Sequence, residues 1–263
     1  MSQRSYVVYA ALILFAGTIF FMWWRSSRDR WSAPAAKEPA ALIVVTNAEY
    51  PPFSFIDESD RVVGFDIDVV REVAKRMGKE LDLIDRPFDA LIAELQTGRA
   101  QLAAAGMTPT PERAMLVLFT KPYFGGDPLV IVTRKSDMPV ANVEGLQGNR
   151  VVVNEGFTAD YYMSAVPGVE VTRLATVSDA FLALKSGRAD AFVSARSAVK
   201  PFFKIHGKDD YNVVPIAATE EQYALVVSRK HADLLPRVQE ALDGMAADGT
   251  LDALKAKWMP QDD

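Results

Sequence analysis

The first apolar segment of the chain is a run of 19 uncharged residues from Tyr6 to Trp24. A helix of that length rises about 1.5 Å per residue and just spans the roughly 30 Å hydrocarbon core of a bilayer. We therefore predict a signal anchor, a transmembrane helix within residues 1–25, and then a linker over residues 26–40 that is rich in proline and alanine. A cleaved signal peptide is the alternative that stays open. The arginines on the two sides of the segment slightly favour a cytoplasmic carboxyl-terminal body.

Beyond residue 40, short β-branched runs alternate with segments of helical spacing. The run Leu42–Val45 is typical of a buried parallel strand. The apolar positions of residues 67–77 predict a helix, with Asp66 as its cap and Gly78 at its end. This alternation predicts an α/β fold with helices on the faces of parallel sheets. The other expected strands are 81–84, 102–105 and 151–153, and the other expected helices are 89–97 and 178–186.

A short repeat divides this body into two halves. Leu95–Ala100 and Leu184–Ala189 each contain the end of a helix, a glycine, Arg-Ala and the approach to a strand. The loops after these strands reach Gly106 in the first half and Ala195 in the second. Ligands bind at the carboxyl ends of parallel strands. The repeat therefore predicts two similar α/β units with a ligand cleft between equivalent loops.

The composition narrows the chemistry. Cysteine is absent and the two histidines are His206 and His231, which excludes a disulfide framework, a thiolate nucleophile and an ordinary zinc centre. The net charge of −5 gives no electrostatic reason to expect nucleic acid. We expect no metal, no cofactor and no nucleic-acid partner.

Five motifs in a fixed order relate the body to a known family. They are Thr46–Phe53 (TNAEYPPF), Gly64–Asp68 (GFDID), Ala105–Arg113 (AGMTPTPER), Phe119–Tyr123 (FTKPY) and Ala247–Trp258 (ADGTLDALKAKW). With these motifs, the chain from about Leu42 to Trp258 resembles the polar amino-acid family of extracellular solute-binding proteins, family 3.

The resemblance implies a periplasmic-binding-protein-like fold, in which two Rossmann-like lobes are joined by two crossover segments. The first lobe would comprise residues 41–131 and 226–263, and the second residues 132–225. The implied function is capture of a small carboxylate-bearing ligand, expected to be amino-acid-like, for an ABC transporter permease. We expect a monomer without catalytic residues, in the periplasm and anchored to the inner membrane, or secreted if the amino-terminal segment is cleaved.

The resemblance also implies the ligand-binding residues. A ligand carboxylate in a closed cleft needs a permanently charged, bidentate partner, which the guanidinium of Arg113 supplies. Gly106 would allow close approach of the backbone, and Thr108 would add a hydroxyl and an N–H group. From the second lobe, Thr158 would complete the carboxylate site. The other expected ligand-binding residues are Asn47, Tyr50, Phe88, Phe157, Ser194 and Arg196.

The sequence departs from the family at Ala195. Amino-acid binders of this family normally carry an aspartate there, which holds the ammonium group of the ligand. A buried ammonium without a carboxylate is costly. Either another residue supplies the acceptor, or the ligand is not an ordinary α-amino acid. In the second case Arg196 would face a second anionic group of the ligand. The candidate acceptors are Asn47, Glu155, Asp160 and Glu221.

Two other functions stay open. Cyclohexadienyl dehydratases share this fold and use an acidic residue just after a Gly-x-Thr segment, near which Asp160 stands. A carboxylic acid in a closing cleft can donate a proton if its pKa is raised. A ligand sensor tethered by residues 1–25 is the second alternative.

Overall fold

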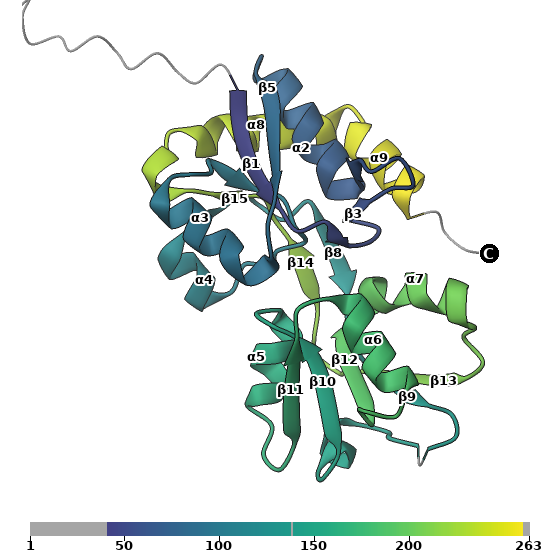
Figure 1. The fold of residues 1–263 in the computed structure, drawn as a ribbon. Coiled ribbons are helices and arrows are strands. Elements are labelled where there is room, and N and C mark those ends of the chain that lie inside the picture. The colour runs from purple at the N-terminus through teal and green to yellow at the C-terminus, as the bar shows by residue number, and fades with distance from the viewer. Residues whose placement is uncertain (1–40, 138, 260–263) are drawn as a thin grey trace, which may run out of the picture. The chain divides into compact units, whose positions relative to one another are not determined.

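The computed structural model describes residues 41–137 and 139–259 and begins with a five-stranded sheet of order β5-β1-β6-β15-β7 (Figure 1). Strand β1 runs parallel to both of its neighbours. Its Leu42 pairs with Leu81 of β5, and its Val44 pairs with Leu102 of β6. Strand β15 is antiparallel to β6 and β7. The strands are β1 (Ala41–Thr46), β5 (Glu80–Asp85), β6 (Leu102–Ala103), β7 (Leu118–Phe119) and β15 (Val226–Val227).

The second sheet repeats the arrangement of the first, with order β11-β10-β12-β9-β13. Strand β10 is parallel to β11 and β12, and β9 is antiparallel to β12 and β13. The six-residue repeat leads into β6 in one sheet and β12 in the other, which are the central strands. The strands are β9 (Leu129–Arg134), β10 (Arg150–Asn154), β11 (Glu170–Leu174), β12 (Ala191–Ala195) and β13 (Tyr211–Pro215).

Two crossover strands connect the sheets and pair with each other (Figure 1). Strand β8 (Phe124–Asp127) leads from β7 to β9, and β14 (Glu221–Tyr223) leads back from β13 to β15. They are antiparallel, with Glu221 opposite Asp127. Residues 129–131, which the sequence analysis placed in the first lobe, therefore pair within the second sheet, because β9 begins at Leu129.

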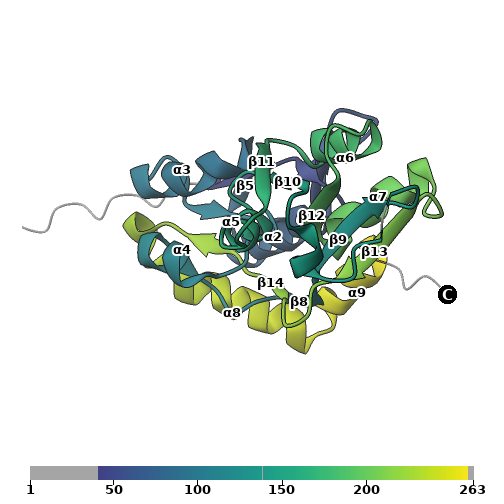
Figure 2. The ribbon, with the colours of Figure 1, turned by 90° about the horizontal axis from the view of Figure 1, so that it is seen from below.

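Helices pack on both faces of the first sheet, because alternate side chains of β1 point to opposite faces. Val44 belongs to the core under α2, while Val45 belongs to a separate cluster with Leu91 and Leu95 of α3. Helices α2, α8 and α9 contact one another, and α8 and α9 follow one another along one side of the molecule (yellow in Figure 2). The helical elements of this half are α2 (Phe65–Arg76), η1 (Phe88–Ala90), α3 (Leu91–Thr97), α4 (Pro111–Leu116), η3 (Arg229–His231), α8 (Leu234–Ala247) and α9 (Thr250–Trp258).

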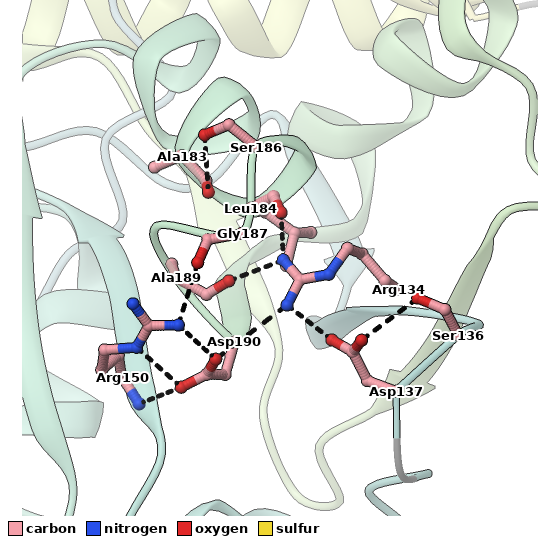
Figure 3. Close-up of polar contacts among 10 residues, drawn as sticks. All are labelled: Arg134, Ser136, Asp137, Arg150, Ala183, Leu184, Ser186, Gly187, Ala189 and Asp190. Atoms are coloured by element: carbon pink, nitrogen blue, oxygen red, sulfur yellow. Dashed lines mark hydrogen bonds and ion pairs between the residues drawn. The ribbon is translucent and has the colours of Figure 1, made fainter.

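The second sheet is covered in the same way, and two arginines hold the end of α6 (Figure 3). Arg134 at the end of β9 donates to the carbonyl oxygens of Leu184 and Ala189. Arg150 at the start of β10 donates to the Gly187 carbonyl oxygen at 2.9 Å. Cations are favourable at a helix carboxyl end, where carbonyl groups lack partners. The helical elements are η2 (Val143–Leu146), α5 (Thr158–Ser164), α6 (Val177–Lys185) and α7 (Arg196–His206).

The start of α2 differs from the sequence prediction. The helix begins after Gly64, whose φ is +137°, and Asp66 does not cap it. A Cβ atom on Gly64 would lie 2.2 Å from the Phe53 carbonyl oxygen, so a larger residue does not fit there. The buried Asp66 side chain instead accepts a hydrogen bond from the Gly106 N–H at 2.5 Å. The first turn of α2 thus holds a loop 40 residues away rather than its own backbone.

The predicted anchor (residues 1–25) and linker (residues 26–40) lie outside the described residues. Within the part of the chain that the structure describes, no helix has the length and apolar character needed to cross a membrane.

Candidate functional site

A small cavity is lined by residues from both halves of the chain and from the crossover strand β14. Its volume is about 10 Å³, enough for about one water molecule. Seven of the ten expected ligand-binding residues line it, together with three others. The expected ones are Tyr50, Phe88, Gly106, Arg113, Phe157, Thr158 and Ser194, and the others are Ala159, Ala195 and Glu221.

Arg113 is a buried cation that joins the two sides of the cavity. It belongs to α4, which starts with Pro111 and is capped by the Thr110 side chain. The guanidinium donates to the carbonyl oxygen of Thr108 at 2.8 Å and, from the other half, to that of Gly156 at 2.8 Å. The side chain is only 4 % exposed, and burial lowers its pKa.

No ion pair of the described residues involves Arg113, whose close partners are neutral. Its guanidinium carbon lies 5.4 Å from the ring centroid of Phe88 and 5.9 Å from that of Tyr161. A buried charge is costly unless it is paired, and carbonyl dipoles compensate it only in part. The arrangement therefore favours an incoming anion, and the planar guanidinium suits the two oxygens of a carboxylate.

Gly106 lies directly against an aromatic side chain of the cavity. Its φ is +56°, and a Cβ atom there would lie 2.7 Å from Cε1 of Tyr50. Its N–H group is already bound to the carboxyl group of Asp66. Burial raises the pKa of Asp66 to about 7, although the bond from Gly106 opposes that shift. The absence of a Cβ atom at Gly106 thus lets the Tyr50 ring lie close to the backbone, while the N–H group holds a buried acid.

Three aromatic rings form the apolar wall. The ring of Phe157 lies 4.5 Å from that of Phe88 and 5.5 Å from that of Tyr50, centroid to centroid. Tyr50 comes from a small three-stranded sheet, and its hydroxyl lies 2.7 Å from that of Tyr223 in β14. That sheet comprises β2 (Glu49–Tyr50), β3 (Ser54–Ile56) and β4 (Val62–Val63). The planes of these ring pairs are tilted by 54° and 90°, so the rings offer an angled apolar wall to the side chain of a ligand.

The second half contributes backbone and hydroxyl groups. Helix α5 starts at Thr158, and the Gly156 N–H donates to Asp160 at 3.1 Å. Asp160 also pairs with Arg173 at 2.9 Å and does not line the cavity. The dehydratase alternative rested on Asp160, so the acid on which it depended is held in an ion pair. Ser194, at the end of β12, is 1 % exposed, and its Oγ has no hydrogen-bond partner among the described residues.

Glu221 is the acidic residue of the cavity. It lies in β14, is 6 % exposed and accepts a hydrogen bond from the Thr108 hydroxyl at 2.6 Å. Burial raises its pKa, while the hydroxyls of Thr108 and Thr158 oppose the shift. Glu221 is one of the four candidate acceptors that the sequence offers, and of these four it is the one that lines the cavity.

The remaining expected residues lie outside the cavity wall. Thr108 acts through its carbonyl oxygen and hydroxyl, which bind Arg113 and Glu221. The Asn47 side chain donates to the Arg86 carbonyl oxygen at 3.2 Å. Arg196, in the first turn of α7, lines a separate surface groove of about 610 Å³.

Two buried residues next to the site, Asp127 and Tyr223, were missed from the sequence; the Tyr223 hydroxyl contacts that of Tyr50. Asp127 in β8 accepts hydrogen bonds from the Ser197 N–H at 3.0 Å, from the Ser197 hydroxyl and from the Tyr223 hydroxyl at 3.1 Å. Helix α7 begins after Ala195, which has no side-chain acceptor, and Asp127 supplies one. Because this cap comes from a strand 70 residues earlier, no local motif reveals it.

Comparisons with known proteins extend over nearly the whole described region. The family model of bacterial extracellular solute-binding proteins, family 3, matches residues 42–261. The arginine-binding extracellular protein ArtP of Bacillus subtilis is 31 % identical over 220 residues, 82 % of this chain and 85 % of that protein. The L-cystine-binding protein TcyJ of Escherichia coli is 28 % identical over 239 residues, 90 % of each chain.

The solved structures give the same result for the fold. An ancestral arginine-binding protein bound to arginine superposes with a TM-score of 0.80 and 34 % identity, covering 85 % of this chain and 100 % of that one. The α/β periplasmic-binding-protein fold expected from the sequence is confirmed by these neighbours.

Proposed function

Because the chain belongs to the bacterial extracellular solute-binding proteins, family 3, we propose that it captures an amino acid outside the cytoplasm and delivers it to an ABC transporter. The observation that carries this proposal is the buried guanidinium of Arg113, which joins both halves of the chain through neutral carbonyl groups. The α-carboxylate of an amino acid is the anion that would complete this site. Transport requires no chemistry on the ligand, so no residue has a catalytic role in this proposal.

The other residues have roles that follow from their positions. Tyr50, Phe88 and Phe157 would contact the side chain of the ligand, since their rings form the apolar wall. Thr158, at the first turn of α5, would donate to the carboxylate beside Arg113. The named relatives bind arginine and L-cystine, which are both amino acids and support this class of ligand.

We also propose that the amino-terminal segment holds the protein at the membrane. With residues 1–25 as a membrane anchor and residues 26–40 as a tether, the binding body would remain close to its transporter as a monomer. The length and apolar character of Tyr6–Trp24 support the anchor.

A thermal-shift screen tests the proposed function. The purified body, residues 41–263, is heated with each of the twenty amino acids and with L-cystine, and calorimetry then measures the affinity of each hit. A ligand at 100 times its dissociation constant adds about 2.7 kcal/mol to the free energy of unfolding. Agmatine, which is arginine without its carboxylate, serves as the control and should produce no shift. The proposal fails if no amino acid stabilises the protein.

A further inference from the structure

One basic and one acidic side chain line the cavity. They belong to Arg113 and Glu221, and the other lining residues have neither a guanidinium nor a carboxyl group. In the described part of the chain, Arg113 and Glu221 form no ion pair with each other, although the charge of each shifts the pKa of the other. Both charges therefore face the same small space without neutralising each other in direct contact.

Glu221 is poorly compensated where it lies. It is 6 % exposed, and the donors to its carboxylate are neutral hydroxyls, that of Thr108 at 2.6 Å and that of Thr158, while Arg113 acts on it without forming an ion pair. A buried carboxylate is stable when a cation or several donors compensate it. The pairing of β14 with β8 fixes the position of Glu221, because its backbone is opposite Asp127 in the crossover.

Ser194 gives a second, independent sign of a ligand. Its hydroxyl is buried, lines the cavity and has no partner among the described residues. Buried polar side-chain atoms nearly always have a hydrogen-bond partner, so an unpaired one beside a cavity indicates a polar group of a ligand. The neighbouring Ala195 lines the cavity without offering any acceptor.

We propose that Glu221 accepts the α-ammonium group of the ligand, with the Ser194 hydroxyl as a second acceptor. This inference rests on the proposed function and assigns the other half of the zwitterion. The cavity then recognises the α-amino acid by opposite charges at its two ends, Arg113 for the carboxylate and Glu221 for the ammonium. Carboxylic acids that lack the amino group would be rejected, because they leave Glu221 buried without a cation.

The test compares an amino acid with its desamino analogue in three proteins. The probes are L-arginine with 5-guanidinopentanoate and L-glutamine with 5-amino-5-oxopentanoate, extended to any other hit of the screen. The proteins are the wild type, Glu221→Gln and the matched control Glu220→Gln. Glu220 is the exposed neighbour and accepts a hydrogen bond from the Gly126 N–H, which a glutamine oxygen can also accept.

The expected result is a loss of discrimination in one variant only. The wild type and Glu220→Gln should bind the amino acid at least tenfold more tightly than its analogue, a difference of about 1.4 kcal/mol. Glu221→Gln should bind the amino acid at least tenfold more weakly and distinguish the two probes by less than threefold. Circular dichroism checks that the variants fold. Glu221→Asp, which keeps the charge, should retain part of the discrimination.

Three outcomes would overturn the inference. Equal wild-type affinity for an amino acid and its analogue would do so without any variant. Unchanged affinity in Glu221→Gln would show that the carboxylate does not touch the ligand. If Glu221→Gln weakens L-arginine and 5-guanidinopentanoate equally, Glu221 binds the side-chain cation instead. In each of these cases the proposed function still stands, whereas a wild type that binds no amino acid refutes the proposed function itself.

Discussion

Replacement of Arg113 by alanine tests the carboxylate site most directly. The side chain is 4 % exposed, and in the proposed complex it provides the fixed positive charge for the carboxylate. Its removal leaves a ligand carboxylate buried without a partner, which costs about 2–5 kcal/mol. We therefore expect the affinity for the best amino acid of the screen to fall by about 30- to 5,000-fold.

The stability of the same variant should change much less. Arg113→Ala loses the hydrogen bonds to the carbonyl oxygens of Thr108 and Gly156, each 2.8 Å long. That loss is offset because a charge without an ion-pair partner no longer has to be buried. We expect the free energy of unfolding without ligand to stay within about 2 kcal/mol of the wild type.

Isothermal titration calorimetry and urea unfolding measure the two quantities separately. Arg113→Lys keeps the charge without the planar fork and should bind with intermediate affinity. Arg99→Ala is the matched control, since Arg99 is 66 % exposed and pairs with Glu94 on the surface. Affinity of Arg113→Ala within threefold of the wild type would refute the assignment of the carboxylate to this residue.

Three further predictions concern a buried acid, a helix cap and the anchor. The pKa of Asp66 is raised from 3.8 to about 7, so its contribution to stability is complete below about pH 4 and is lost as the pH rises to about 7. In Asp66→Asn that loss is absent, and urea midpoints at pH 4.5 and 7.5 should differ less than in the wild type; an equal difference in both proteins would contradict the assignment. Asp127→Ala uncaps α7 by removing the acceptor of the Ser197 N–H, so denaturant unfolding should show a loss of about 1–2 kcal/mol, and an unchanged value would disprove the cap. The full-length protein should stay in the membrane fraction after carbonate extraction because Tyr6–Trp24 anchors it. Release into the supernatant, or a mature protein that lacks this segment by mass spectrometry, would refute the anchor.

The features that the sequence predicted are those set by local patterns. β-branched runs and helical spacing indicated β1 and α2, and the repeat around Gly98 and Gly187 indicated two equivalent units. Both glycines have a positive φ, of +78° and +76°, which explains why glycine follows each helix. Gly106 and Ala195 line one cavity, because Gly106 comes shortly after the central strand of the first sheet and Ala195 ends the central strand of the second.

The features that the sequence did not predict depend on pairing between distant segments. The helix dipole favours an aspartate in the first turn of a helix, yet the Asp66 side chain caps no backbone N–H of α2 and instead accepts a hydrogen bond from the Gly106 N–H. Glu221 could not be ranked above the other candidate acceptors, since its position depends on β14 pairing with β8. Arg196 follows Ala195 directly, but its side chain leaves the cavity as α7 begins. The direction of such a side chain is set by tertiary packing rather than by neighbours in the sequence.

The small volume of the cavity has a kinetic consequence. A space for about one water molecule is too small for an amino acid, so the two sides that Arg113 joins must separate before a ligand enters. The observed association rate in a stopped-flow experiment should therefore approach a limit at high ligand concentration, and that limit is the rate of opening. The opening step, rather than diffusion of the ligand, then sets how often one molecule can be loaded.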